Sequence, residues 1–534
     1  MTRLARIGAV LLLAAAPAAA RDHGRAQVVP YIELGQTAAA DLNSGDVLTW
    51  TSVAAGVDAR VDAPRATAQL SYRYERQIAE SGGLRDQDSH SGLARAEVRV
   101  TPNLTLDAGA LATRTHADGG GGAARLFAPG ERDTSLVYAL YAGPSFAARF
   151  GPVALAAAYQ IGYTRVDAPR FDGLAPGPPR GGYFDDSLGQ SATASAGIAP
   201  RAVLPVGLTA SAGWFQERAG QLGQHYDDRF GRGDVLAPIS ANVAIAGGVG
   251  YEAVTTSQRD PLLTAAGAPL LDPNGRFRTD PNGQRRITYR TDGLYYDAGV
   301  VWRPNRRTSV AGYAGRRYGS GSYTGAISWQ ASPTVGFAAQ VYDSVTTFGR
   351  QLRTGIDNLP TSFIATRDQF AQAFNGCTFG TSGAAPGGCL DGVFQSVTAA
   401  SYRARGVDAV LSATRGPSTY GVGAGYANRK LFAPVQVTGA SIYGREDQSW
   451  YADLFLHRAL SPVSGVDATA FFDDYDPAQP GADDVLSTGA TASYYHDFGR
   501  LGTTAALGLY AFRTGGGDET ALRGQATVGA RYSF

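Results

Sequence analysis

The residues of this chain best suited to covalent chemistry are its only two cysteines, Cys377 and Cys389. A cysteine pair in an exported chain predicts a disulfide, because compartments outside the cytoplasm are oxidising. Closing a ring of this size stabilises a folded segment by about 3 kcal/mol. Metal binding would need further ligands nearby, and no histidine lies in residues 226–456. The cysteines therefore predict a structural crosslink and no metal site.

Other residues that could act as catalysts or metal ligands are scattered. Two copies of Asp-Pro-Asn-Gly, at residues 272–275 and 280–283, lack the alternating ligands and distal glutamate of a calcium-binding loop, so they predict turns. No histidine has metal-site spacing or belongs to a recognisable Ser-His-acid grouping. We therefore expect no enzyme activity, no cofactor and no metal. The histidines are His23, His90, His116, His225, His457 and His496.

Charged side chains recur at alternate positions in segments that we interpret as strands. In residues 70–76, for example, leucine and tyrosine alternate with serine, arginine and glutamate. The mixed signs indicate salt bridges across strands or a hydrophilic pore lining, and they favour neither an anion nor a cation. The charged side chains expected to face a lumen are Arg73, Glu75, Arg95, Glu97, Arg99, Asp297, Asp453 and Asp467.

The elements that position these residues are predicted to be β-strands. Apolar and polar residues alternate from about residue 30 to the end, and no segment shows convincing helical periodicity or an apolar run long enough for a transmembrane helix. The chain is rich in glycine, with 69 residues, and in tyrosine, with 27. In hydrocarbon every backbone polar group needs an internal partner, which a closed sheet supplies. The pattern predicts an all-β protein with one large antiparallel transmembrane β-barrel.

The amino terminus has the layout of a secretory signal peptide. Arg3 and Arg6 precede the apolar stretch 7–16, and small residues follow at 18–20. We predict a signal peptide at 1–20, a short periplasmic segment at 21–28 and an outer-membrane barrel at 29–534. The net charge of +1 gives no electrostatic reason to expect nucleic acid as a partner.

Short connections, most of them with proline, alternate with longer polar ones. Examples are residues 101–103, 332–333 and 416–417, whereas the longest polar segment is 347–397. Proline suits tight turns and cannot donate to a ladder, so the short connections are interpreted as periplasmic turns and the long ones as external loops. Ten tight turns and eleven outer connections predict 22 strands, within a range of 20 to 24.

The carboxyl terminus carries an alternating apolar row that includes Val528, Tyr532 and Phe534. A last strand that ends in phenylalanine resembles the signal read by the barrel-assembly machinery of the outer membrane. We therefore expect that machinery as a partner during insertion. The expected permanent surroundings are outer-membrane lipid and lipopolysaccharide.

Several short motifs resemble the outer-membrane β-barrel proteins associated with PEP-CTERM/exosortase and exopolysaccharide systems. They are Val29–Glu33, Tyr72–Arg76, Gly250–Glu252 and the stretch Phe374–Gly392 that contains both cysteines. The resemblance implies an outer-membrane location and polysaccharide-export components as partners. It transfers no catalytic residue.

These observations predict a porin-like channel for solutes or for exopolysaccharide export. The alternative is a structural or surface-interaction barrel whose lumen is closed by loops. A TonB-dependent receptor also has 22 strands, but no plug domain is expected because the first strand begins soon after the signal peptide. Loop 347–397 either folds inward, as its apolar residues Leu359, Phe363, Phe370 and Phe374 indicate, or forms a stapled surface loop.

Overall fold

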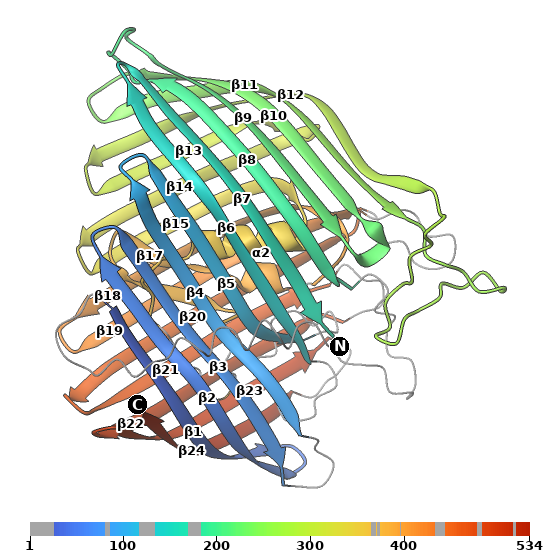
Figure 1. The fold of residues 1–534 in the computed structure, drawn as a ribbon, viewed down its shortest axis with the longest axis vertical. Coiled ribbons are helices and arrows are strands. Elements are labelled where there is room, and N and C mark those ends of the chain that lie inside the picture. Colours follow the sequence, from blue (N-terminus) through green and yellow to red (C-terminus); the bar gives the residue numbers. More distant parts are fainter. Residues whose placement is uncertain are drawn as a thin grey trace.

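The computed structural model is a barrel of long β-strands that encloses a helix and a small hairpin (Figure 1). It describes residues 26–80, 86–116, 134–168, 183–364, 370, 374–395, 397–432, 444–477, 483–515 and 520–534. The predicted signal peptide at 1–20 lies outside the described residues. The first strand begins at Ala26, inside the segment that we predicted as a periplasmic extension.

The wall is a 22-stranded sheet in which consecutive strands pair antiparallel, and it closes where β1 pairs with β24, from Tyr31↔Ser533 to Asp41↔Arg523. The first strands are β1 (Ala26–Asp41), β2 (Val47–Ala63), β3 (Ala66–Ala79), β4 (Gln87–Thr101), β5 (Leu104–His116), β6 (Thr134–Phe150), β7 (Val153–Asp167), β8 (Asp186–Ile198), β9 (Gly207–Ala219), β10 (His225–Pro238) and β11 (Val243–Arg259). The others are β12 (Arg285–Asn305), β13 (Thr308–Arg317), β14 (Ser320–Ser332), β15 (Val335–Thr346), β18 (Ser401–Arg415), β19 (Ser418–Phe432), β20 (Glu446–Ser461), β21 (Ser464–Asp476), β22 (Val485–Phe498), β23 (Leu501–Thr514) and β24 (Ala521–Ser533).

The two faces of each strand have different surroundings, as the alternation predicts. On β12, Leu294 and Tyr296 are 74% and 56% exposed on the outside of the barrel, whereas Tyr295 between them is 5% exposed on the inside. Lipid stabilises large apolar side chains that point away from a closed sheet. The protein is accordingly an outer-membrane β-barrel. Within the described part of the chain, no helix combines the length and the apolar character needed to cross a membrane.

The two rims of the barrel differ in their connections. On one rim every connection is short, and the proline turns predicted from the sequence lie there, such as Pro333 between β14 and β15. We assign this tight-turn rim to the periplasm and the opposite, long-loop rim to the outside. Three outer connections are also short, at 42–46, 220–224 and 318–319. In the shortest, Tyr318 and Gly319 between β13 and β14 both have positive φ, the geometry of a two-residue hairpin turn.

The longest outer connection does not stay outside the barrel. The connection 347–400 is called here the inserted segment. Its described residues, 347–364, 370, 374–395 and 397–400, enter the lumen between β15 and β18. The hairpin within them reaches the tight-turn rim, where the Gly383 N–H donates to the Pro333 carbonyl at 2.8 Å. The elements of the inserted segment are α2 (Phe348–Asn358), β16 (Cys377–Ser382), β17 (Ala385–Cys389) and α3 (Asp391–Phe394).

The prediction of a barrel without a plug is therefore wrong. A plug was expected only as a domain preceding the first strand, whereas the lumen here is filled from a loop. The expectation that no helix is present also fails at α2. Its apolar residues Phe348, Leu352 and Ile356 recur every four positions, but they are surrounded by polar residues and glycine that resemble a loop. Of the two alternatives left open for the loop, the structure has the inward fold.

Candidate functional site in the lumen

Helix α2 lies against the inner face of the barrel wall through an apolar stripe. Phe348, Leu352 and Ile356 are fully buried, and they form one cluster with wall residues such as Leu93 of β4 and Val137 of β6. Thr347 caps the amino end of the helix by accepting the Arg350 N–H at 3.2 Å. Apolar residues on the inner face would be unfavourable beside a water-filled pore, so this part of the wall is built to bind the helix.

Two arginines on the polar side of α2 pair with carboxylates of the wall. Arg353 forms an ion pair with Glu217 of β9, and the two side chains are 6% and 3% exposed. Arg350 donates to Asp228 of β10 at 3.2 Å and to the hydroxyl of Tyr226 at 2.6 Å. A buried charge that loses its partner is strongly unfavourable, so these pairs bind the helix to this position.

The other end of α2 is held by a cation of the wall. Arg95 of β4 donates from Nε to the Leu359 carbonyl at 3.0 Å and from Nη2 to the Asp357 carbonyl at 2.7 Å. The last carbonyls of a helix lack intrahelical donors and carry partial negative charge, so a guanidinium stabilises them. The hydroxyl of Tyr141 donates to the Asp357 carboxylate at 2.8 Å. Both ends of the helix are therefore anchored to the wall.

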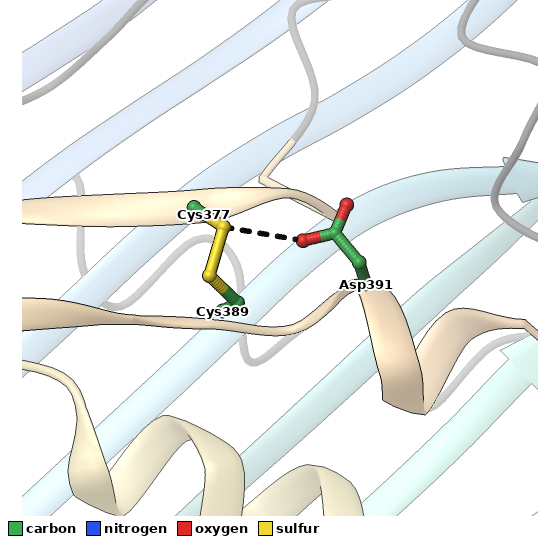
Figure 2. A group of neighbouring side chains, drawn as sticks. All are labelled: Cys377, Cys389 and Asp391. Atoms are coloured by element: carbon green, nitrogen blue, oxygen red, sulfur yellow. Dashed lines mark hydrogen bonds between the residues drawn. A yellow bond between two sulfur atoms is a disulfide. The ribbon is translucent and has the colours of Figure 1, made fainter. Parts of the chain in front are cut away.

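The hairpin of β16 and β17 is closed by a disulfide between Cys377 and Cys389 (Figure 2). Asp391 Oδ2 lies 3.5 Å from Cys377 Sγ. Because the sulfurs are bonded to each other and carry no hydrogen, the three residues offer neither thiolate ligands nor a thiol donor. Asp453 of β20 accepts the Cys377 N–H at 2.9 Å and ties the hairpin to the wall.

Glycines in the wall leave room for the inserted segment. A Cβ at Gly423 of β19 would overlap Cys377 Sγ, and one at Gly421 would overlap the ring of Phe379. On the opposite side, a Cβ at Gly189 or Gly162 would overlap the side chain of Arg353. The wall is thus shaped to the inserted segment on two sides of the lumen.

A cavity of about 570 Å³ remains beside the inserted segment, along β1–β3 and β20–β24. It extends to the tight-turn rim at Arg500, and Ile364 and Phe370 of the inserted segment close one side. Its charged groups largely satisfy each other: Arg73 pairs with Glu33 at 2.6 Å, and His457 lies 2.7 Å from Asp467. Hydroxyl groups and aromatic rings make up much of the remaining lining, a surface suited to a small, polar, uncharged solute. The cavity-lining hydroxyl and aromatic residues include Thr37, Trp50, Ser52, Thr469, Thr491, Ser493, Tyr495, Thr503, Thr504 and Thr527.

The structure places the charged residues predicted for the lumen in several different environments. Arg73 and Glu75 are paired with each other in the wall of the cavity, which Asp467 also lines. Arg95 and Asp453 hold the inserted segment, as described above. Asp297 pairs with Arg232 at 2.7 Å on the far side of the lumen. Glu97 and Arg99 share the face of β4 that carries Arg95 and lie nearer the tight-turn rim.

The assembly residues keep the arrangement expected from the sequence. Val528 and Phe534 are 60% and 61% exposed on the outside of the barrel, and the rings of Tyr532 and Phe534 lie 5.2 Å apart. A role in insertion stays a prediction.

Sequence reasoning missed the residues that fix the inserted segment. Glu217 and Asp228 were not singled out, because their partners Arg353 and Arg350 lie far away in the chain. Two signals were present nonetheless. One is the four-residue spacing of the apolar residues of α2. The other is the run 421–425, where glycine occupies every inward position of β19.

Replacing both cysteines by serine should loosen the hairpin without affecting the barrel. The crosslink is worth at most about 3 kcal/mol by the chain-entropy estimate. Amides of residues 377–389 should therefore exchange hydrogen faster, by up to about 100-fold, whereas β1 and β24 should exchange as before. Hydrogen-exchange mass spectrometry measures this. Faster exchange spread evenly over the barrel would contradict a local role.

Comparisons with known proteins give no family. No family model matches the sequence, and no curated protein matches it. Among solved structures, the FrpB iron transporter from Neisseria meningitidis (F3-3 variant) matches with a TM-score of 0.43 and 10% identity, over 95% of this chain and 81% of that one. The ferric-catecholate import receptor Fiu from E. coli K12, in its open form, matches with a TM-score of 0.42 and 9% identity, over 94% and 81%. The siderophore receptor PiuA from Acinetobacter baumannii matches with a TM-score of 0.41 and 9% identity, over 94% and 82%.

The prediction of a porin-like or polysaccharide-export channel is wrong. Described residues of the inserted segment occupy the lumen that such a channel would need open. The resemblance to the PEP-CTERM/exosortase-associated barrels stays a prediction.

Proposed function

We propose that this protein is a gated outer-membrane transporter, in which the inserted segment closes the lumen and must rearrange before a solute can pass. The observation that carries the proposal is that the described residues of the inserted segment lie inside the barrel and are bound to the wall at both ends of α2 and along the hairpin. The contacts of Arg353, Arg350 and Arg95 support it, since they join the segment to strands on one side of the wall.

The contacts also favour a gate over a permanent stopper. Much of the attachment consists of ion pairs and hydrogen bonds between the segment and the wall, groups that water can solvate once the segment moves away. A permanently closed lumen could be filled by apolar packing alone, which is often at least as stable as a buried ion pair. The cavity beside Ile364 and Phe370 provides a place for a small polar solute next to the gate.

Replacing residues 348–399 by a short Gly-Ser linker tests the proposal. Thr346 and Tyr402 are paired neighbours, so a short turn can join β15 to β18. The wild-type barrel should show rare, brief openings in a planar bilayer, and the shortened barrel should show a large, steady conductance. Cells that carry the shortened barrel should also become sensitive to antibiotics too large for porins, such as vancomycin.

Shortening the connection between β11 and β12 by removing residues 261–283 serves as the control. Arg259 and Arg285 are paired at its base, so a turn can close it, and the deleted residues lie outside the inserted segment. This variant should conduct as the wild type does. A wild-type barrel that conducts as strongly as the one without residues 348–399 would overturn the proposal.

A further inference from the structure

The hydrogen-bonded ladder between β14 and β15 ends halfway up the wall. It runs from Ser332↔Val335 at the tight-turn rim to Gly325↔Val341. Beyond this point, residues 320–324 of β14 pair only with β13, and residues 342–346 of β15 pair only with β18. Five residues of strand span about 16 Å. The two strands therefore separate over a length of roughly half the hydrocarbon core, which is about 30 Å thick.

The point at Gly325↔Val341 where the two strands separate is called here the fork. Between the fork and the long-loop rim, the outer face of β15 becomes buried. Val341 and its partner Val407 are 42% and 38% exposed on the outside of the barrel. Side chains alternate between the faces of a strand, so Asp343 and Val345 belong to the same face as Val341. They are only 5% and 1% exposed. Protein therefore covers the part of β15 that would face lipid in a regular barrel.

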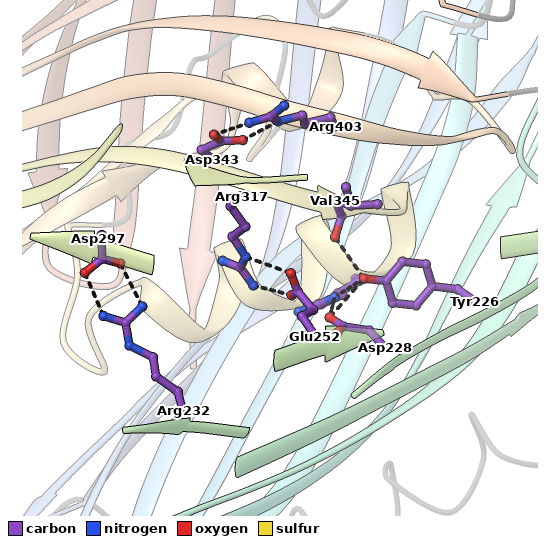
Figure 3. A network of polar contacts seen from close by, with 10 residues as sticks. Tyr226, Asp228, Arg232, Glu252, Asp297, Arg317, Asp343, Val345 and Arg403 are labelled. Carbon is purple, nitrogen blue, oxygen red and sulfur yellow. Dashed lines mark hydrogen bonds and ion pairs between the residues drawn. The ribbon is translucent and has the colours of Figure 1, made fainter. Parts of the chain in front are cut away.

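The covering surface is the inner face of the strands across the fork. The Tyr226 hydroxyl of β10 donates to the Val345 carbonyl at 2.9 Å (Figure 3). Val345 belongs to one buried apolar cluster with Tyr226 and with Val254 of β11. Phe432 at the end of β19 stacks on Tyr289 of β12, with ring centroids 4.1 Å apart. An outer face can meet the inner face of other strands only if the ends of β15, β18 and β19 bend into the lumen. Residues 342–346 and 401–405 are called here the flap.

The opposite face of the flap contacts the inserted segment. The two ends of the inserted segment also continue directly from the two strands of the flap, β15 and β18. The Tyr402 hydroxyl donates to Gln351 of α2 at 2.7 Å. At the fork, Arg403 pairs with Asp343 at 2.6 Å (Figure 3). It also donates to the Gly321 carbonyl of β14 at 3.2 Å. One arginine side chain of the flap thus reaches the edge strand from which β15 has separated.

We propose that the flap and the inserted segment move as one gate, and that opening completes the ladder between β14 and β15. Continuing the register Gly325↔Val341 would pair Ser322 with Ser344 and Ser320 with Thr346. In that state the flap joins the barrel wall and draws the ends of the inserted segment away from the inner face of β9–β12. The inference rests on the proposed function and identifies the moving part.

Backbone chemistry supports two stable positions for the flap. A strand edge without a ladder leaves N–H and C=O groups that need other partners, most of all within a membrane. In the closed position side chains supply some of them: Arg403 binds the Gly321 carbonyl and Tyr226 binds the Val345 carbonyl. In the open position the two edges would satisfy each other. Opening exchanges the flap contacts for ladder hydrogen bonds, and such an exchange gives an element two discrete positions.

A disulfide between the separated strands tests this inference. The variant Ser322→Cys with Ser344→Cys places two thiols on the inward faces of β14 and β15, where the completed ladder would make them partners. Oxidation of the full-length barrel in a bilayer should trap the open position slowly, as openings occur. The trapped barrel should show an open probability at least tenfold higher than before oxidation. Peptide mass spectrometry measures the crosslinked fraction.

The matched control is Ser328→Cys with Ala338→Cys, a pair on the same faces that is already joined in the ladder. It should crosslink rapidly and leave the conductance unchanged. The inference is wrong if the upper pair crosslinks without a change in conductance. It is also wrong if that pair never crosslinks, even after Arg403→Met with Arg405→Met removes the arginine contacts across the fork to Ser320 and Gly321. The linker replacement of residues 348–399 does not depend on the fork, so its result reports on the proposed function alone.

Discussion

Replacing Glu217 by glutamine should open the barrel and lower its stability. Arg353 would then remain buried without its counter-charge, and removal of one partner from a buried ion pair costs about 3–5 kcal/mol. Arg353 belongs to the inserted segment and gains water only when the segment leaves the wall. Most of the cost therefore falls on the closed state, and 3 kcal/mol corresponds to about a 100-fold shift toward the open state. Single-channel open probability measures the shift directly.

A second substitution separates the ion pair from the helix contact. Arg353→Met in the Glu217→Gln background removes the unpaired charge and keeps an unbranched apolar chain in its place. The open probability should return most of the way to the wild-type value, because apolar replacement of a buried pair is often neutral. Arg76→Met breaks an exposed pair with Asp86 on the outside of the barrel. It should change neither the open probability nor the stability measurably. Equal opening in the single and double variants would contradict this role for the charge.

The barrel could be predicted from the sequence because each of its features is local. Alternation at period two sets the two faces of a strand, as at Leu294, Tyr295 and Tyr296. Proline and short polar connections mark the tight turns, such as the one at Pro333. Counting the turns gave 22 strands, the number in the sheet. None of these signals depends on which residues meet across the lumen.

The gate could not be predicted in the same way, because its contacts join residues that are distant in sequence. Glu217 and Arg353 are separated by 136 positions, and Arg95 and Leu359 by 264. A loop that fills a lumen must carry polar residues and glycine where it contacts water and turns, so its composition resembles that of a surface loop. The fork at Gly325↔Val341 left one signal that was not used. Asp343 of β15 stands in the row of outward positions that also holds Val341 and Val345, where a charge would be unfavourable beside lipid.

Replacing Gly423 by leucine should displace the hairpin from the wall. The new side chain would occupy the position of Cys377 Sγ, and the disulfide prevents the two hairpin strands from separating to make room. Overpacking in a filled interior costs about 1–3 kcal/mol. The strand itself should tolerate leucine, since Gly423 pairs in a regular ladder with Val410 and Asp453. The strain is relieved only if the hairpin moves, so the open probability should rise by about 5- to 150-fold.

Gly293→Leu is the matched control, because Gly293 also lies in a strand on the inner face and a Cβ there would meet no atom within 4 Å. It should leave the conductance unchanged. Heat-dependent migration in SDS gels should show that both barrels remain folded. If Gly423→Leu conducts like the wild type while it stays folded, the hairpin adjusts without leaving the wall, and the glycines of β19 do not set its position. If it conducts more, the position of the hairpin limits passage, since nothing else in the wall has changed.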